Sequence, residues 1–179
     1  MPGRGSMRTL LHRITTGMRP PWSLDLSTSQ PGNGLFTRRV EHLRQGEDPR
    51  LLARMPGGWA VLGDRQPNDI TGCCMLIPDP VVSSVNELDP GARAAFMNDL
   101  VNLGDAVLTA TGAERVNYLI LGNQVPELHG HVIPRFASED PARRRQGPFE
   151  AYDFGAATPS EPLGVHADLV RLLRSTLAD

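Results

Sequence analysis

Residues 127–135, "ELHGHVIPR", are the stretch on which the fold and the chemistry of this chain depend. Side chains alternate between the two faces of a strand, so a strand here would place Glu127, His129 and His131 on one face. The preceding run "RVNYLIL", residues 115–121, also has the length of a strand, and the loop "GNQVP" between the two runs contains a glycine. The two runs therefore predict an antiparallel hairpin that carries three titratable side chains on one face.

The longest helix is predicted directly upstream of this hairpin. Asp89 is a capping residue, and the proline that follows it suits the first helical position. Gly112 marks the end of the helix. The apolar stripe that would face the core consists of Phe96, Leu100, Leu103 and Val107.

Shorter apolar patterns predict the remaining elements. Helical spacing between Phe36 and Gly46 predicts a first helix, and residues 48–55 predict a second short helical turn. The apolar runs at 58–64 and 72–79 are bounded by turn residues and have the length of strands. A last short helix is predicted near the C-terminus from Val165, Leu169, Leu172 and Leu173.

Composition divides the chain into three parts. Residues 1–34 are rich in Pro, Gly, Ser and Thr and are expected to form an irregular N-terminal arm. Residues 35–136 hold the predicted strands and the long helix, and residues 137–179 are expected to form a polar loop and a short helix. A chain of 179 residues has the length of a single domain with tails.

Charge and hydropathy exclude several classes of protein. The net charge is −2, and acidic residues outnumber basic ones, so no footprint for duplex DNA or RNA is expected. No apolar run reaches the length that spans a bilayer, and the first residues lack the apolar core of a secretory signal. We therefore expect a cytoplasmic protein that does not bind membranes. Cys73 and Cys74 are adjacent, which predicts neither a disulfide framework nor a metal site.

The paired histidines admit a catalytic and a purely structural interpretation. Imidazole is the side chain best suited to proton transfer and nucleophilic attack near neutral pH. The loop before His129 carries Asn123 and Gln124, whose amides can donate hydrogen bonds to an oxyanion. Two strand histidines can also be hydrogen-bonded parts of a structure, and the pattern leaves that alternative open.

The segment "RVNYLILGNQVPELHGHVIPRF" resembles the signature region of the histidine-triad (HIT) superfamily of nucleotide hydrolases and transferases, His-φ-His-φ-His-φ-φ with φ apolar. The match runs from Glu127 to Ile133 and is followed by the Pro-Arg pair common in the diadenosine tetraphosphate hydrolase-like branch. Glu127 replaces the first histidine, and Gly130 replaces a bulky apolar residue. The resemblance covers roughly residues 58–136. It implies an α+β fold, with an antiparallel sheet of about five strands and a main helix packed on one face.

The resemblance implies covalent chemistry at His129. In the family the middle histidine attacks the α-phosphorus of a nucleoside 5′-phosphate anhydride or phosphoramidate, giving a nucleotidyl-histidine that water hydrolyses. His131 would donate to a non-bridging phosphate oxygen, and Asn123 and Gln124 would help to hold the phosphoryl group. Glu127 would add negative charge beside His129. No cofactor is required, although a divalent cation can arrive with the substrate phosphates.

The resemblance also suggests binding residues and a partner. Asp64 lies where the family places an acid that binds the ribose hydroxyls, although a turn aspartate is an equal alternative. Asn117 falls at a polar site position, and Arg135 would pair with distal phosphates or cap the strand. Like the family, the chain is expected to form a homodimer.

Two rival hypotheses remain open at this point. In the first, Glu127 marks a HIT scaffold that binds nucleotides without turning them over. In the second, Glu127, His129 and His131 are metal ligands, as in barrels where His-x-His on a strand binds a divalent ion.

Overall fold

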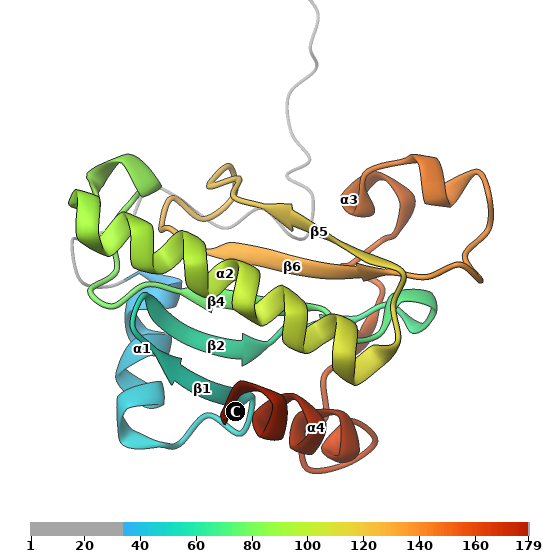
Figure 1. Ribbon diagram of the computed structural model, residues 1–179, viewed down its shortest axis with the longest axis horizontal. Helices are drawn as coiled ribbons and strands as arrows, with labels where there is room; N and C mark the ends of the chain where they lie inside the picture. The colour runs from blue at the N-terminus through green and yellow to red at the C-terminus, as the bar shows by residue number, and fades with distance from the viewer. Residues whose placement is uncertain (1–33, 179) are drawn as a thin grey trace, which may run out of the picture.

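Five antiparallel strands form one sheet in the order β1-β2-β4-β6-β5 (Figure 1). The computed structural model describes residues 34–178, so the predicted arm lies outside the described residues except for Gly34. A second, two-stranded sheet pairs β3 with β7. The helices and strands are α1 (Leu35–Gln45), β1 (Leu51–Met55), β2 (Gly58–Leu62), β3 (Arg65–Gln66), β4 (Cys74–Ile77), α2 (Pro90–Thr111), β5 (Arg115–Leu119), β6 (Gly130–Arg135), α3 (Pro148–Ala151), β7 (Thr158–Pro159) and α4 (Ala167–Ala178).

The helix α2 has the ends that its sequence predicts. The Asp89 side chain accepts a hydrogen bond from the Ala92 N–H at 2.9 Å, and Gly112 has the left-handed backbone that ends many helices. All four residues of the predicted apolar stripe are buried against the sheet. The predicted α+β fold, with a five-stranded antiparallel sheet and a main helix on one face, is therefore confirmed.

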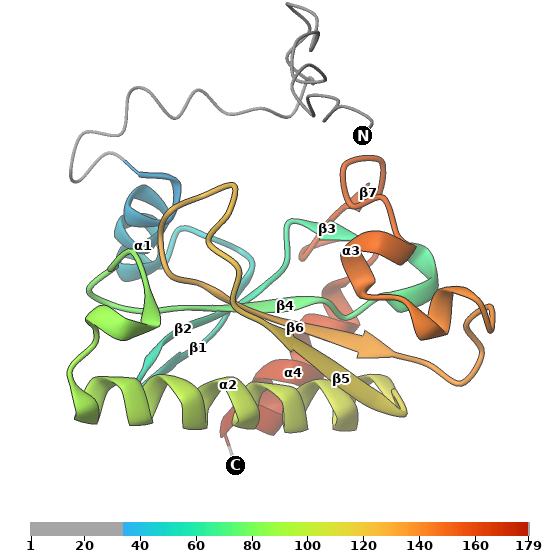
Figure 2. The same ribbon diagram turned by 90° about the horizontal axis from the view of Figure 1, so that it is seen from above.

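The two faces of the sheet are covered by different elements (Figure 2). Helices α2 and α4 pack on one face, whereas α1 and α3 lie over opposite ends of the other face. Strand β4 alternates accordingly, because Cys74 and Leu76 join the core under α2 while Met75 and Ile77 join the core under α1. The side chains of β4 thus contribute to two hydrophobic cores, one on each face of the sheet.

The prediction of a helical turn over residues 48–55 is wrong. Leu51–Met55 form strand β1, which pairs with β2 at the edge of the sheet. Helical and strand patterns are hard to distinguish in so short an apolar run, and the hydrogen bonds from β2 decide the outcome. At the other end of the chain, Val165 lies before α4 and is exposed, while Val170 and Leu173 are buried.

The predicted hairpin is present, but its second strand starts later than expected. Strands β5 and β6 pair antiparallel, with Leu119 opposite His131. Strand β6 begins at Gly130, so residues 127–129 belong to the connection. The Leu128 N–H donates to the Val82 carbonyl at 2.6 Å rather than to a neighbouring strand. In the described part of the chain, no helix is both long and apolar enough to cross a membrane.

Candidate functional site

His129 and His131 lie side by side where the connection enters β6. Their ring centroids are 4.8 Å apart, and the rings are nearly perpendicular. Between them, Gly130 faces the opposite side, where an added Cβ would come within 2.6 Å of the Leu100 side chain on α2. A bulkier residue would collide with α2, which explains why a glycine separates the two histidines.

The orientation of the His129 ring is set by the backbone. Its Nδ1 lies 2.8 Å from the Glu127 carbonyl oxygen. A carbonyl oxygen only accepts, so Nδ1 carries the proton, and Nε2 of the neutral ring keeps its lone pair. A neutral Nε2 held in one direction has the form that a nucleophile requires.

Burial favours the neutral form of both rings. The pKa of His129 is lowered by burial, although its hydrogen bond to the Glu127 carbonyl acts in the other direction. Burial, followed by the neighbouring His129, lowers the pKa of His131 to about 4. Both imidazoles are therefore neutral at pH 7.

This shift predicts how stability depends on pH. The unfolded chain binds a proton at His131 near its ordinary pKa of 6.5, whereas the folded chain binds it only near about 4. Protons therefore favour the unfolded state in this window, and the free energy of unfolding should fall as pH decreases from 6.5 toward 4. Urea titrations at several pH values measure the slope. His131→Asn should reduce it, and an equal slope in this variant would contradict the prediction.

The prediction that Glu127 shares a face with the two histidines is wrong. Its side chain points to the start of α1 instead. Its carboxylate accepts hydrogen bonds from the Phe36 N–H at 2.8 Å, the Thr37 N–H at 3.1 Å and the Thr37 hydroxyl at 2.5 Å. Gly34, at the helix N-cap position, has no side chain to cap α1. An added Cβ there would collide with this carboxylate. Glu127 therefore caps α1 from a distance, and its carboxylate is not available with the two imidazoles as a third metal ligand.

The capping role leads to a stability prediction. Glu127→Ala and Glu127→His both remove the carboxylate, so each should lower the free energy of unfolding by about 1–2 kcal/mol. Glu127→Gln keeps one acceptor oxygen and should lose less. Urea denaturation measures the differences, with Glu47→Ala as the control because Glu47 is exposed just beyond α1. Equal losses at positions 127 and 47 would contradict the capping role.

Asp64 takes part in a network of ion pairs at the side of α1. Its carboxylate contacts the guanidinium groups of Arg39 and Arg50, and both arginines also bind Asp48. Arg39 is buried and lies one turn after Phe36 on α1. The Asp64 side chain keeps 47% of its surface exposed, which leaves room for a ribose hydroxyl beside the arginines.

Arg135 is fully engaged in a buried network. Its Nε and Nη2 donate to the Glu139 carboxylate, and Nη1 donates to the Asn117 Oδ1 at 3.0 Å. The carbonyls of Arg143 and Gln146 accept its remaining hydrogen bonds. Because all five guanidinium donors have partners, this arginine holds the end of β6 and has no donor left for distal phosphates.

The predicted amides lie in different places. Asn123 and Gln124 are exposed on the connection between β5 and β6. Asn117 lies on β5 opposite Ile133, and it lines a hollow of about 470 Å³ with Arg115, Arg144 and Arg145 among others.

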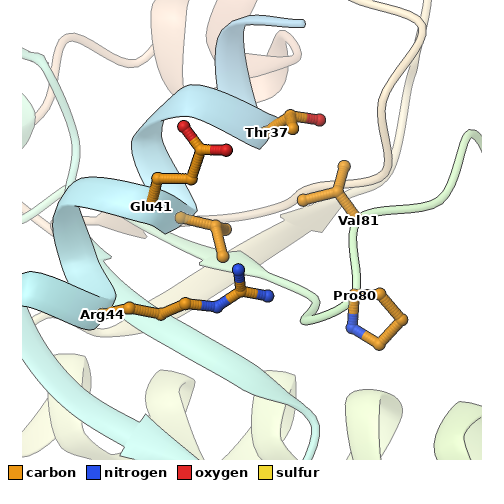
Figure 3. Close-up of a pocket in the computed structure, with 6 residues that line it drawn as sticks. Thr37, Glu41, Arg44, Pro80 and Val81 are labelled. Carbon is orange, nitrogen blue, oxygen red and sulfur yellow. The ribbon is translucent and has the colours of Figure 1, made fainter. Parts of the chain in front are cut away.

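A second hollow, of about 230 Å³, lies between α1 and the chain that follows β4 (Figure 3). It is lined by Thr37, Val40, Glu41, Arg44, Pro80 and Val81. Neither lining contains His129 or His131, so the hollow that Asn117 lines is separate from the two histidines.

The sequence patterns do not predict the aromatic residues that lie beside the histidines. The Phe36 ring lies 4.4 Å from the His129 ring, and the Phe149 ring lies 5.2 Å from the His131 ring. In the sequence, Phe36 indicates only the start of the first helix, through its helical spacing. The signal for the second ring was the run "FEAYDF", residues 149–154, in which three aromatic residues interrupt a polar loop.

Comparisons relate this arrangement to known proteins. Residues 59–138 match the family model described as HIT domain. Among solved structures, a histidine triad protein from Bradyrhizobium japonicum is 20% identical, with a TM-score of 0.60 over 76% of this chain and 96% of that chain. A histidine triad protein from Sinorhizobium meliloti is 25% identical, with a TM-score of 0.58 over 75% of this chain and 93% of that chain.

A hypothetical histidine triad nucleotide-binding protein from Sulfolobus tokodaii is also similar. It is 16% identical, with a TM-score of 0.57 over 77% of this chain and 89% of that chain. No curated protein matches the chain in sequence.

Proposed function

Because residues 59–138 match the HIT domain model, we propose that the chain belongs to the histidine triad superfamily, binds a nucleotide and cleaves a nucleoside 5′-phosphate anhydride or phosphoramidate. The observation that carries this proposal is the His129 ring. Its Nδ1 proton is held by the Glu127 carbonyl, and its Nε2 is left free beside His131. Burial keeps this nitrogen unprotonated at neutral pH, as a nucleophile requires.

The proposed reaction has two displacement steps. First, the Nε2 lone pair of His129 attacks the α-phosphorus, an N–P bond forms, and the leaving group departs with the electrons of its bond to phosphorus. Water then attacks the same phosphorus and loses a proton to solvent, the N–P bond breaks with its electron pair returning to Nε2, and a nucleoside monophosphate is released. His131 would donate its ring N–H to a non-bridging oxygen in both steps. The steps need no resident cofactor, and a divalent cation carried by the substrate phosphates is compatible with them.

The remaining site residues take supporting roles in this proposal. The exposed part of the Asp64 carboxylate would bind the ribose hydroxyls beside α1. The loop amides of Asn123 and Gln124 would turn toward the phosphoryl group when substrate binds, since loop side chains commonly reorient at such sites. Asn117 and Arg135 would instead maintain the end of the sheet that supports the site.

Trapping the intermediate tests the proposal. The protein should turn over diadenosine polyphosphates or nucleoside phosphoramidates. Quenching the reaction with nucleotide labelled at the α-phosphate should give an acid-labile adduct on His129, identified by peptide mass spectrometry. Neither turnover nor adduct across a panel of such nucleotides would overturn catalysis and favour a binding scaffold.

We also propose that the chain forms a homodimer. The supporting observation is a group of exposed apolar side chains on α2 and the edge strand β5, comprising Met97, Val101 and Tyr118, each more than two-fifths exposed. Exposed apolar groups of this kind commonly mark interfaces. Sedimentation of the purified protein as a monomer at micromolar concentration would rule the dimer out.

A further inference from the structure

The peptide group between Glu127 and Leu128 is held in place without help from a strand. Its carbonyl oxygen lies 2.8 Å from the His129 Nδ1, and its N–H donates to the Val82 carbonyl at 2.6 Å. Strand β6 begins only at Gly130, so this peptide group lies outside the ladder of the sheet. Its orientation therefore depends on the few contacts that the connection between β5 and β6 makes with other segments.

The Glu127 side chain attaches this peptide group to α1. Its carboxylate accepts hydrogen bonds from the N–H groups of Phe36 and Thr37 and from the Thr37 hydroxyl. Phe36 is buried, and its ring also contacts the His129 ring. Glu127 therefore closes the N-terminus of α1, which lies beside the connection (Figure 2), with its side chain, and it holds the His129 ring with its main chain.

The neutral His129 ring has two tautomers, and the Glu127 carbonyl selects between them. When Nδ1 carries the proton, the Nε2 lone pair is available for attack. When Nε2 carries the proton, that atom cannot attack phosphorus. If the peptide group turned away, Nδ1 would lose its acceptor and the second tautomer would gain population. The orientation of this one carbonyl thus sets the fraction of the protein that is ready to react.

We propose that the Glu127 carboxylate is a positioning group for the nucleophile, and that its attachment to the N-terminus of α1 keeps His129 in the reactive tautomer. This inference rests on the proposed function and adds a residue that acts through His129. It also gives a reason for a carboxylate at this position. A carboxylate has lone pairs for all three donors of α1, whereas a neutral imidazole has a single acceptor nitrogen.

Gly34 offers a variant that separates capping of α1 from positioning of His129. It precedes α1 with an extended backbone, φ −69° and ψ 163°, which serine also adopts at helix N-caps. The atoms nearest to an added Cβ there all belong to the Glu127 carboxylate. Glu127→Ala clears this space, so Gly34→Ser in the same chain can cap α1 through its own hydroxyl. The double variant restores the cap without restoring the link to the Glu127 carbonyl.

Two measurements on these variants test the positioning role. Nitrogen-15 NMR at pH 7 distinguishes the two imidazole tautomers, and the His129 signals are identified by their absence from His129→Ala. In the wild-type protein, His129 should be in the Nδ1–H form alone. In Gly34→Ser combined with Glu127→Ala, the free energy of unfolding should recover toward wild type, yet His129 should populate both tautomers. Its kcat for a nucleoside phosphoramidate should remain roughly ten- to a hundredfold below wild type, with KM unchanged.

Glu127→Gln and Glu47→Ala are the matched controls. Glutamine keeps an acceptor oxygen within reach of α1 but has no charge, so Glu127→Gln should retain the Nδ1–H tautomer and most of kcat. Glu47→Ala removes an exposed carboxylate just beyond α1 and should change neither quantity. If Glu127→Gln has the tautomer mixture and low kcat of Glu127→Ala, the charge matters and not the attachment to α1, and the proposal is overturned.

The remaining outcomes separate this inference from the function on which it rests. Recovery of stability, tautomer and kcat together in the double variant would reduce Glu127 to a helix cap. If Gly34→Ser does not restore stability, Glu127→Ala decides the question below its unfolding transition: a tautomer mixture supports positioning, and a pure Nδ1–H form overturns it. The tautomers are measured without substrate. A wild-type protein that turns over no nucleotide therefore refutes the proposed function, while the NMR spectra still decide how His129 is held.

Discussion

Replacing His129 with alanine is expected to abolish turnover of every nucleotide substrate. Alanine offers no lone pair to the α-phosphorus, so the covalent route is lost. Removal of a nucleophile from a covalent mechanism typically costs roughly five orders of magnitude or more in kcat. Steady-state assays of the purified variant measure the loss. The acid-labile adduct should disappear with it, while nucleotide binding measured by calorimetry should persist.

His131→Ala is the matched comparison for this experiment. His131 lies 4.8 Å from His129 between ring centroids and would donate one hydrogen bond to the phosphoryl group. Loss of one such donor typically lowers kcat by about two to three orders of magnitude. The adduct should still form, only more slowly. Residual activity in His129→Ala equal to that in His131→Ala would show that His129 is not the nucleophile.

Replacing Arg135 with alanine is expected to cause the largest loss of stability. The Arg135 and Glu139 side chains are 3% and 0% exposed, and the substitution would leave the Glu139 carboxylate buried without its cation. Breaking a buried ion pair in this way costs about 3–5 kcal/mol. The bonds to Asn117 and to two backbone carbonyls would be lost as well. Urea denaturation followed by circular dichroism measures the change.

Two further variants identify the cause of that loss. Arg145→Ala removes an exposed arginine from the same region and should change stability by less than about 0.5 kcal/mol. Arg135→Met combined with Glu139→Leu removes both charges and should recover part of the stability. An Arg135→Ala protein that is as stable as wild type, but binds nucleotide polyphosphates more weakly, would instead restore the predicted contact with distal phosphates.

The sequence alone was sufficient to predict the ends of a helix whose capping residues lie directly beside it in the chain. The helix α2 begins after Asp89 and ends at Gly112, as predicted, because capping bonds join residues only a few positions apart. The apolar runs around β2 and β4 were predicted as strands, since buried strands need continuous apolar residues. The adjacency of His129 and His131 also follows from their spacing of two.

The residues at which strands begin and end are determined by hydrogen bonds to the neighbouring strands. The run at residues 51–55 contains no pattern that separates a strand from a short helix, and only pairing with β2 makes it β1. Likewise, β6 starts at Gly130 because the ladder with β4 starts there, and Leu128 bonds to the chain after β4 instead. Hydrogen bonds between distant segments decide these limits.

The roles of Glu127, Arg135 and Phe149 depended on distant contacts. Glu127 interrupts the histidine pattern, but its partners at the start of α1 are 90 and 91 residues away. Arg135 is a conspicuous charge in the sequence, yet burial beside Glu139 gives it a structural role. Phe149 reaches His131 only because Tyr152 attaches α3 to that same buried pair. Residue type and spacing indicated the two imidazoles, whereas packing between remote segments determined which groups surround them. The reason is that the contacts of a side chain depend on which distant segments fold against it, and these are not its neighbours in sequence.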